Sequence, residues 1–217
     1  MLKLNPLSRS LHHRVALLVG GWLCIATGVV SILHAGFGAG PFDVLNVGVA
    51  GHLGVQVGTA SWVTTAVLIV VAMMLGKRPG PATFMSSFFV GGLVNVMLGV
   101  VPTPEGLAFR VALLCGGTAL LYFGVCLVVV AGLGNGAIDM LMFAIGSKGV
   151  SLRAARWGIE AGAVCAGVLL GGTAGVATVL IALSAGPALM RLIPRVDTLP
   201  LIAANPAREY SLAVVRA

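Results

Sequence analysis

Charged side chains are scarce in this sequence of 217 residues, where Asp, Glu, Lys and Arg together make up 9%. A soluble domain of this size needs more polar surface than that, so a soluble globular protein is excluded. Apolar side chains make up 59% of the chain, and the mean hydropathy is +1.08. About 20 apolar residues span the hydrocarbon core of a bilayer as a helix. Six such stretches cover residues 15–34, 58–76, 82–101, 111–130, 157–172 and 174–192. We therefore predict an all-α membrane protein with about six transmembrane helices.

The sequence also lacks the motifs of metal sites and of membrane enzymes. Its four cysteines lie inside apolar stretches and form no C-x-x-C pair, and neither H-E-x-x-H nor G-x-S-x-G occurs. Two aspartates in separate loops leave an aspartyl protease formally open, but their different flanking residues argue against it. We therefore predict no enzyme, no catalytic residue, no metal and no cofactor.

The net charge of +7 does not indicate binding to nucleic acid, because the basic residues form no single patch. They lie at the edges of the apolar stretches, where Lys and Arg orient membrane proteins. With six crossings and a cytoplasmic N-terminus, 12 of the 13 basic residues fall on the cytoplasmic side and only Arg110 falls outside. The charge pattern thus predicts that both termini are cytoplasmic.

The chain contains one apolar unit twice. Residues 14–21 read R-V-A-L-L-V-G-G and residues 110–117 read R-V-A-L-L-C-G-G, a shift of 96 residues. One residue is later lost, and a shift of 95 aligns Gly54, Trp62, Gly80, Thr83 and Gly91 with Gly149, Trp157, Gly175, Thr178 and Gly186. A duplicated apolar unit is how many transporter folds are built.

The duplication divides the membrane domain, 14–192, into repeat one, 14–101, and repeat two, 110–192. Three crossings per repeat make the second copy enter the membrane from the opposite side, so we predict two inverted three-helix repeats. The flanking segments, 1–13 and 193–217, are predicted to be a cytoplasmic N-terminal segment and a cytoplasmic tail.

A glycine-rich stretch before an aspartate recurs in both repeats. The segment A-G-F-G-A-G-P-F-D-V-L at 35–45 corresponds to A-G-L-G-N-G-A-I-D-M-L at 131–141. Alternating glycines break a helix, and the backbone they expose at membrane depth needs protein or a watery cavity to satisfy it. We predict that a short re-entrant or interfacial helix follows each break, at 41–53 and at 137–147, since neither segment is long enough to span.

Asp43 and Asp139 follow the two glycine stretches, and the sequence allows two interpretations of these aspartates. Each carboxylate caps its own short helix, or the two together line a cavity and bind a cation, a proton or a cationic substrate. The other candidate ligands are glycines and amides of the same segments. They are Gly38, Gly40, Gly134, Gly136, Asn46 and Asn135.

Glu160 is a further acid near an apolar stretch. Arg156 precedes it by four residues, a spacing that allows a helical ion pair, and we expect that pair at the membrane interface. The matching residue in repeat one is Thr65, so Glu160 is not part of the duplicated design.

The segment G-F-G-A-G-P-F-D-V-L-N-V-G, followed by G-V-Q-V-G-T-A-S and later by K-R-P-G-x-x-T, resembles the bacterial YczE/YyaS/YitT-type integral membrane proteins. The resemblance covers about residues 14–192, with G-L-G-N-G-A-I-D as a degenerate second copy of the motif. It implies a polytopic protein of the bacterial inner membrane with about six helices. It implies no substrate or reaction, and it carries over no catalytic residue.

These features favour a small secondary transporter or permease for an unidentified small solute or ion, with Asp43 and Asp139 at its site. The alternative is a non-transporting scaffold or partner protein in the membrane. The expected partners are the lipid bilayer and the solute, without nucleic acid, and we allow for a homo-oligomer.

Overall fold

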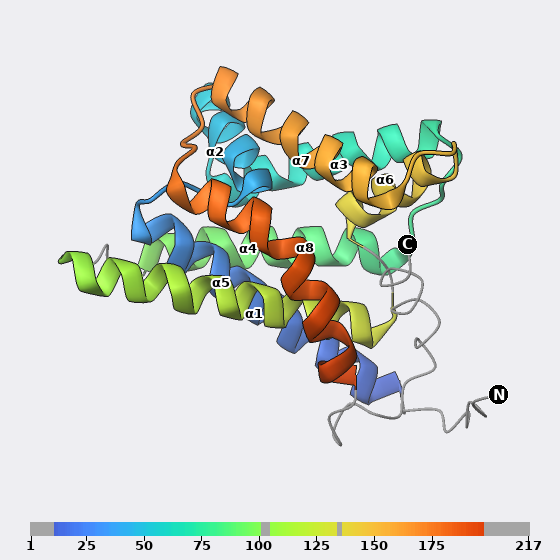
Figure 1. Ribbon diagram of the computed structural model, residues 1–217, viewed down its shortest axis with the longest axis horizontal. Helices are drawn as coiled ribbons and strands as arrows, with labels where there is room; N and C mark the ends of the chain where they lie inside the picture. Colours follow the sequence, from blue (N-terminus) through green and yellow to red (C-terminus); the bar gives the residue numbers. More distant parts are fainter. Residues whose placement is uncertain (1–10, 101–104, 134–135, 198–217) are drawn as a thin grey trace.

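A computed structural model describes residues 11–100, 105–133 and 136–197, and every regular element in these ranges is a helix. Most of the two predicted cytoplasmic segments lies outside these ranges. Figure 1 shows the helices in chain order. They are α1 (Leu11–Ala35), α2 (Pro41–Leu53), α3 (Val57–Met74), α4 (Pro81–Val100), α5 (Leu107–Ala131), α6 (Ala137–Gly146), α7 (Leu152–Leu169) and α8 (Val176–Asp197).

Five of the described helices, α1, α3, α4, α5 and α8, are long and apolar enough to cross a membrane. The stretch predicted at 157–172 lies mostly in α7, which is not among the five and carries Arg153, Arg156 and Glu160. Helices α2 and α6 have 13 and 10 residues, fewer than the roughly 20 that a bilayer needs. The chain is therefore an all-helical, multi-pass membrane protein, and a sixth crossing through α7 stays a prediction.

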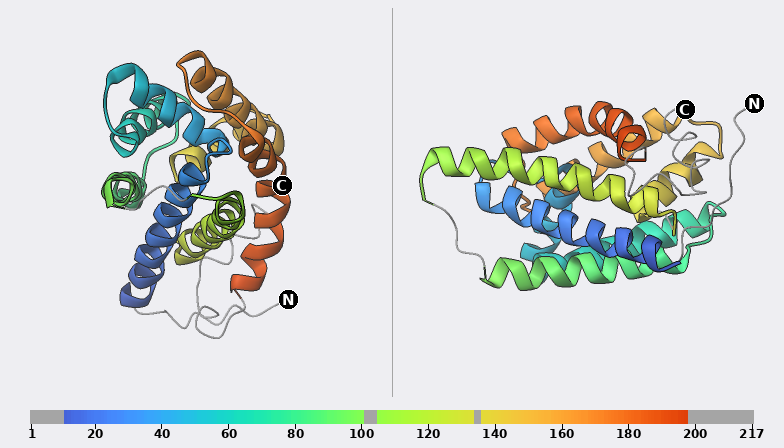
Figure 2. Two further views of the ribbon diagram at one scale, coloured as in Figure 1. Left: turned by 90° about the vertical axis from the view of Figure 1, so that its left-hand side faces the viewer. Right: turned by 90° about the horizontal axis from the view of Figure 1, so that it is seen from below.

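Helices α1 and α5 form the most extensive contact of the fold and lie side by side in both views of Figure 2. Glycines permit their close approach. A methyl group at Gly28 would lie 2.7 Å from the carbonyl oxygen of Gly117, and one at Gly124 would lie 2.8 Å from that of Gly21. Because the earlier residue of α1 meets the later residue of α5, the two helices are antiparallel. Small residues of this kind are the usual means of close helix packing in membranes.

Two arginines hold the ends of the same helix pair. Arg14, near the start of α1, donates from Nε to the carbonyl oxygen of Ala131 at 2.9 Å, at the end of α5. Arg110, near the start of α5, donates from Nε to the carbonyl oxygen of Ala35 at 2.7 Å, at the end of α1. The last carbonyls of a helix lack partners within it, and a cation there also complements the helix dipole. Arg110, the exception to the charge pattern, thus caps the first helix of the other repeat.

The remaining helices pack in corresponding pairs. Helix α4 packs on α1 as α8 packs on α5, and α3 packs on α2 as α7 packs on α6. The short helices cross between the repeats, since α2 packs on α7 and α6 packs on α3. Two correspondences fail among the described residues. Helix α3 packs closely on α4, whereas α7 has no comparable packing against α8, and α2 contacts α8, whereas α6 has no comparable contact with α4.

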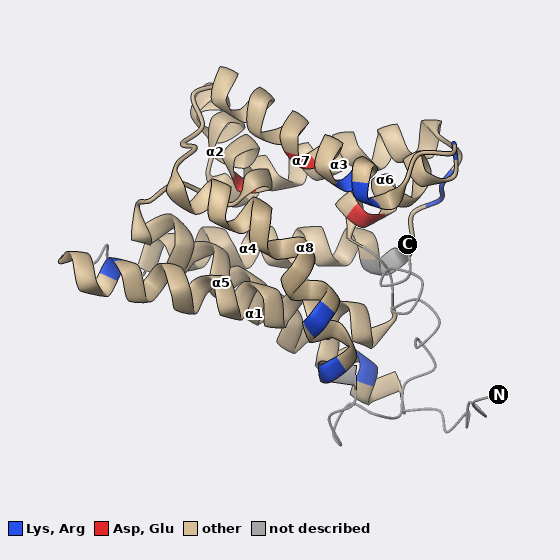
Figure 3. Ribbon diagram, viewed as in Figure 1, with Lys and Arg blue, Asp and Glu red and all other residues tan. Residues whose placement is uncertain are grey.

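Basic residues gather toward one end of the molecule (Figure 3). That end holds the start of α1, the end of α3, the start of α7 and the end of α8. The start of α5, which carries Arg110, lies at the opposite end. The described basic residues thus lie mostly at one end of the long axis, while the side of the membrane that this end faces stays a prediction.

The α1–α5 contact predicts different outcomes for two identical substitutions in α1. Gly28→Ala places a methyl group against the backbone of α5, whereas a methyl group at Gly20 meets nothing within 4 Å. We expect Gly28→Ala to lower the free energy of unfolding in detergent by about 1–3 kcal/mol relative to Gly20→Ala. Both variants gain the same helix propensity, so their difference isolates the crowding. Equal stabilities would contradict this account of the contact.

Candidate functional site

The first glycine stretch connects α1 to α2 through two residues with positive φ. These are Gly36, with φ of 68°, and Gly38, with φ of 102°. A methyl group at Gly38 would lie 2.5 Å from the backbone nitrogen of Gly175. The close approach of the chain that precedes α8 therefore accounts for the glycine at position 38.

Backbone groups of this stretch are satisfied by the same neighbouring segment. Ala39 donates its N–H to the carbonyl oxygen of Thr173 at 3.1 Å, and Ala177 donates to that of Phe37 at 3.0 Å. The hydroxyl of Thr178 donates to the carbonyl oxygen of Ala39 at 2.7 Å. Backbone released by the helix break is thus paired with the other repeat. In the second glycine stretch, Gly134 and Asn135 lie outside the described residues.

Asp43 and Asp139 occupy the same place in their two short helices. Each is the third residue of its helix, and Gly40 or Gly136 precedes the first. A methyl group at Gly40 would lie 3.0 Å from Oδ2 of Asp43, and one at Gly136 would lie 3.6 Å from Oδ2 of Asp139. Each carboxylate therefore turns back toward the start of its own helix, where negative charge complements the dipole.

The surroundings of Asp43 are uncharged. Asn46 donates from Nδ2 to Oδ1 of Asp43 at 3.2 Å, and the hydroxyl of Thr64 donates to Oδ1 of Asn46 at 2.6 Å. The Asn46 side chain is buried. Within the described ranges no Lys, Arg or His forms an ion pair with Asp43.

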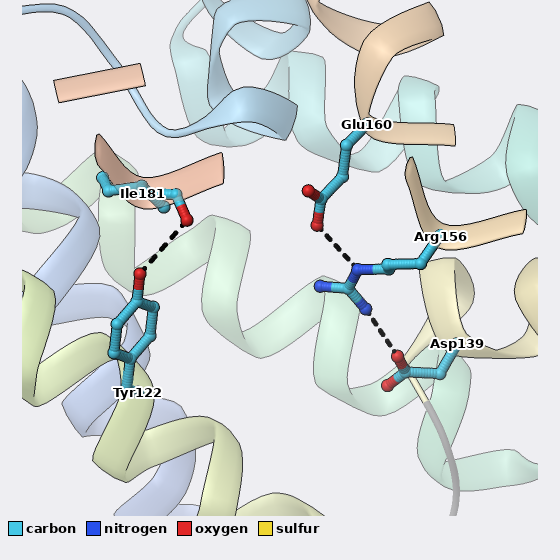
Figure 4. A network of polar contacts seen from close by, with 5 residues as sticks. All are labelled: Tyr122, Asp139, Arg156, Glu160 and Ile181. Atoms are coloured by element: carbon cyan, nitrogen blue, oxygen red, sulfur yellow. Dashed lines mark hydrogen bonds and ion pairs between the residues drawn. The ribbon is translucent and has the colours of Figure 1, made fainter. Parts of the chain in front are cut away.

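The surroundings of Asp139 carry two further charges (Figure 4). Arg156 donates from Nη1 to Oδ1 of Asp139 at 2.9 Å and from Nε to Oε1 of Glu160 at 2.6 Å. The side chains of Arg156 and Asp139 are 30% exposed and that of Glu160 is 13% exposed. We call Asp139, Arg156 and Glu160 the charged triad. Its i,i+4 ion pair on α7 confirms the pairing expected from spacing.

Figure 4 also shows the orientation of Arg156 within the charged triad. Its remaining terminal nitrogen points away from both carboxylates, toward the side where Tyr122 stands. Tyr122 in turn donates to the carbonyl oxygen of Ile181 at 3.3 Å and lies 2.7 Å from the hydroxyl of Ser184. The charged triad therefore faces helices α5 and α8 with a terminal guanidinium nitrogen that no described residue binds.

Sequence reasoning did not foresee the contact between Arg156 and Asp139. One signal was available in the repeat alignment, where Arg156 falls on Ser61 and Met142 falls on Asn46. Together with Thr65 opposite Glu160, these differences show that the places of Arg156 and Glu160 hold neutral polar side chains in repeat one.

Two open grooves lie away from the aspartates. One, of about 380 Å³, lies between α5 and α8 and includes Thr118, Tyr122 and Ser184. The other, of about 470 Å³, lies between α1 and α4 and includes Trp22 and Phe89. They occupy corresponding positions in the two repeats, and neither is lined by an acidic residue. Their apolar walls suit lipid chains better than a polar solute.

Comparison with known proteins decides the family. Residues 12–193 match a family of unknown function, DUF6198. The chain belongs to the DUF6198 family. The matched range runs from α1 into α8 and therefore includes both glycine stretches and the charged triad.

Two relatives of this DUF6198 protein cover most of its length. An uncharacterized protein of Haemophilus influenzae is 26% identical over 88% of each chain. The uncharacterized membrane protein YczE of Bacillus subtilis is 26% identical over 81% of this chain and 83% of its own. This likeness confirms the resemblance to YczE-type membrane proteins. No solved structure matches the chain.

The charged triad predicts strong coupling between its members. Arg156→Gln leaves two carboxylates close together without their cation, and we expect it to lower the free energy of unfolding by about 1–3 kcal/mol. Adding Asp139→Asn and Glu160→Gln should restore part of that loss, because the repulsion disappears with the charges. Chemical unfolding of the single and combined variants in detergent measures the coupling.

Arg153→Gln is the matched control, since Arg153 lies one turn earlier on α7 and is exposed. It should change stability by less than about 0.5 kcal/mol. Strictly additive effects of the three triad substitutions would show that these charges do not act as a unit.

Proposed function

We propose that this protein is a small secondary transporter of the bacterial inner membrane, built from two inverted repeats, with no enzymatic activity. The observation that carries the proposal is the recurrence of one arrangement in both halves. Each half places a carboxylate in the first turn of a short helix that follows a glycine stretch. Broken helices that meet ionisable groups within the membrane are typical of transporter sites.

The antiparallel contact of α1 and α5 supports an inverted relation between the repeats. Arg14 and Arg110 are equivalent in the repeat alignment, and each caps the first helix of the opposite repeat. The exchange of equivalent residues across one contact is what a two-fold axis produces. An axis in the membrane plane would give six crossings, with α7 as the sixth and both termini in the cytoplasm.

The difference between the third and fourth helices of the two repeats supports alternating access. In repeat one, Asn95 accepts from the N–H of Gly58 at 2.7 Å and donates to the hydroxyl of Thr59 at 3.0 Å, which joins α4 to α3. The corresponding helices α7 and α8 lack such close packing among the described residues. Two repeats with one sequence pattern and two packings are the structural basis of a rocking transporter.

The two aspartates take different roles in this proposal. Asp139 is already paired with Arg156, so a cation would have to compete with a guanidinium for it. Among the described residues the partner of Asp43 is the neutral Asn46, so Asp43 offers a carboxylate to a proton or an alkali cation. We assign cation coupling to Asp43, with the amide of Asn46 holding its carboxylate in place.

The charged triad argues for transport rather than for stability alone. Ion pairs withdrawn from water contribute little net stability, and apolar substitutes are often equally stable. Charges among apolar helices usually mark a solute or ion pathway. Retention of three such groups on α6 and α7 is therefore better explained by function.

Flux through proteoliposomes tests the proposal. Vesicles loaded with a pH-sensitive dye, with or without a sodium gradient, would be exposed to a panel of amino acids, sugars, organic acids, phosphate and polyamines. We expect at least one solute to drive cation-coupled flux in the wild type, and Asp43→Asn to abolish the coupling.

Glu105→Gln is the control for removal of a carboxylate, because Glu105 is exposed and lies before α5. It should retain wild-type flux. Flux unchanged by Asp43→Asn would remove that carboxylate from the mechanism. Absence of flux for every solute, with a partner protein co-purifying, would favour the scaffold alternative.

A further inference from the structure

We propose that the transported solute is a small oxyanion, a carboxylate or a phosphate, and that Arg156 binds it. The inference rests on the proposed transporter function and names the class of its solute. Planar guanidinium groups recognise carboxylate and phosphate oxygens through paired N–H donors. Arg156 is placed to act in this way.

The geometry leaves part of Arg156 available. Nε is used by Glu160 and Nη1 by Asp139, while the other terminal nitrogen points toward the Tyr122 side of the bundle (Figure 4). The side chain keeps 30% of its surface exposed. An oxyanion can therefore approach the free edge of the guanidinium before it displaces a carboxylate.

Two arginines at the ends of the long helices are already committed to the backbone. Arg14 donates to the end of α5, and Arg110 donates to the end of α1. The described basic residues of the loops lie toward one end of the molecule (Figure 3). Arg156 differs from both groups because its partners are carboxylates, which another oxyanion can replace.

The fold itself does not need these charges. Repeat one builds the equivalent helix, α3, with Ser61 and Thr65 where α7 has Arg156 and Glu160. Ser61 donates its hydroxyl to the carbonyl oxygen of Gly58, within its own chain segment. The charged pair is therefore specific to repeat two, as expected for residues that recognise a solute.

Charge balance connects this site to the proposed coupling. The triad holds two carboxylates and one guanidinium, so its formal charge is negative when all three are ionised. An oxyanion that takes Arg156 from Asp139 adds a further negative charge among apolar helices. A cation entering with the solute offsets that charge, which makes cation-coupled uptake of an anion the mechanism that fits. A cationic solute that bound Asp139 would instead leave Arg156 paired with Glu160 alone.

Anion binding can be measured without a transport assay. The unfolding temperature of the purified protein in detergent would be followed in sodium acetate, in sodium phosphate and in sodium chloride at equal ionic strength. We expect acetate or phosphate, but not chloride, to raise the unfolding temperature of the wild type with saturation. Acetate alone indicates a carboxylate solute, and phosphate alone indicates a phosphorylated or inorganic one.

Variants assign the binding to one residue. Arg153→Gln should respond like the wild type, whereas Arg156→Gln should not respond. Arg156→Lys should bind the oxyanion at least about tenfold more weakly than the wild type. The combined variant Arg156→Ser, Glu160→Thr and Met142→Asn carries the residues of repeat one at these places, so it should fold and show no response.

Two results would overturn the inference: no stabilisation of the wild type by either oxyanion, or an undiminished response in a folded variant without Arg156. The experiments can reject this inference and the proposed function independently of each other. If oxyanion binding depends on Arg156 but flux is unchanged in Asp43→Asn, the oxyanion site is supported and the cation site is rejected.

Discussion

The close antiparallel contact of α1 and α5 is the constraint on which the other features depend. Glycine pairs let the two backbones approach, and an arginine from each repeat caps the first helix of the other. A methyl group at Gly28 would meet backbone, which a small rotation of a side chain cannot relieve. This contact sets the two glycine stretches at opposite ends of one helix pair, and the short helices that carry the aspartates follow from there.

The same scaffold then holds two different sites. Around Asp43 the partners are an amide and a hydroxyl, and around Asp139 they are a guanidinium and a second carboxylate. Both repeats build the same order of helices with these different side chains. In the proposed transporter Asp43 binds the cation and the charged triad binds the solute. The duplicated helices position both sites, and the residues that differ between the repeats determine what each site binds.

Features that depend on periodicity and local spacing were predictable from the sequence. The repeat is visible as matching residues in the sequence itself. The apolar helices, the short segments after each glycine stretch and the ion pair between Arg156 and Glu160 depend on residues that are close together in the chain. Features that depend on packing between distant helices were not. The contact of Arg156 with Asp139 requires α7 to lie against α6, and the glycine at position 38 proved to face Gly175. An alignment of the repeats locates such residues. It does not show whether a glycine makes room for a ligand or for a neighbouring backbone.

The central claim is that the two repeats have opposite orientations in the membrane, and labelling of single cysteines tests it most directly. In a variant without Cys24, Cys115, Cys126 and Cys165, one cysteine at a time would replace Lys77, Lys148 or His52, which are all exposed. A membrane-impermeant thiol reagent would then be applied to intact cells and to inverted vesicles. Our account predicts that positions 77 and 148 react from the same face and position 52 from the opposite one. Reaction of positions 77 and 148 from different faces would contradict the inverted repeat and the transporter built on it.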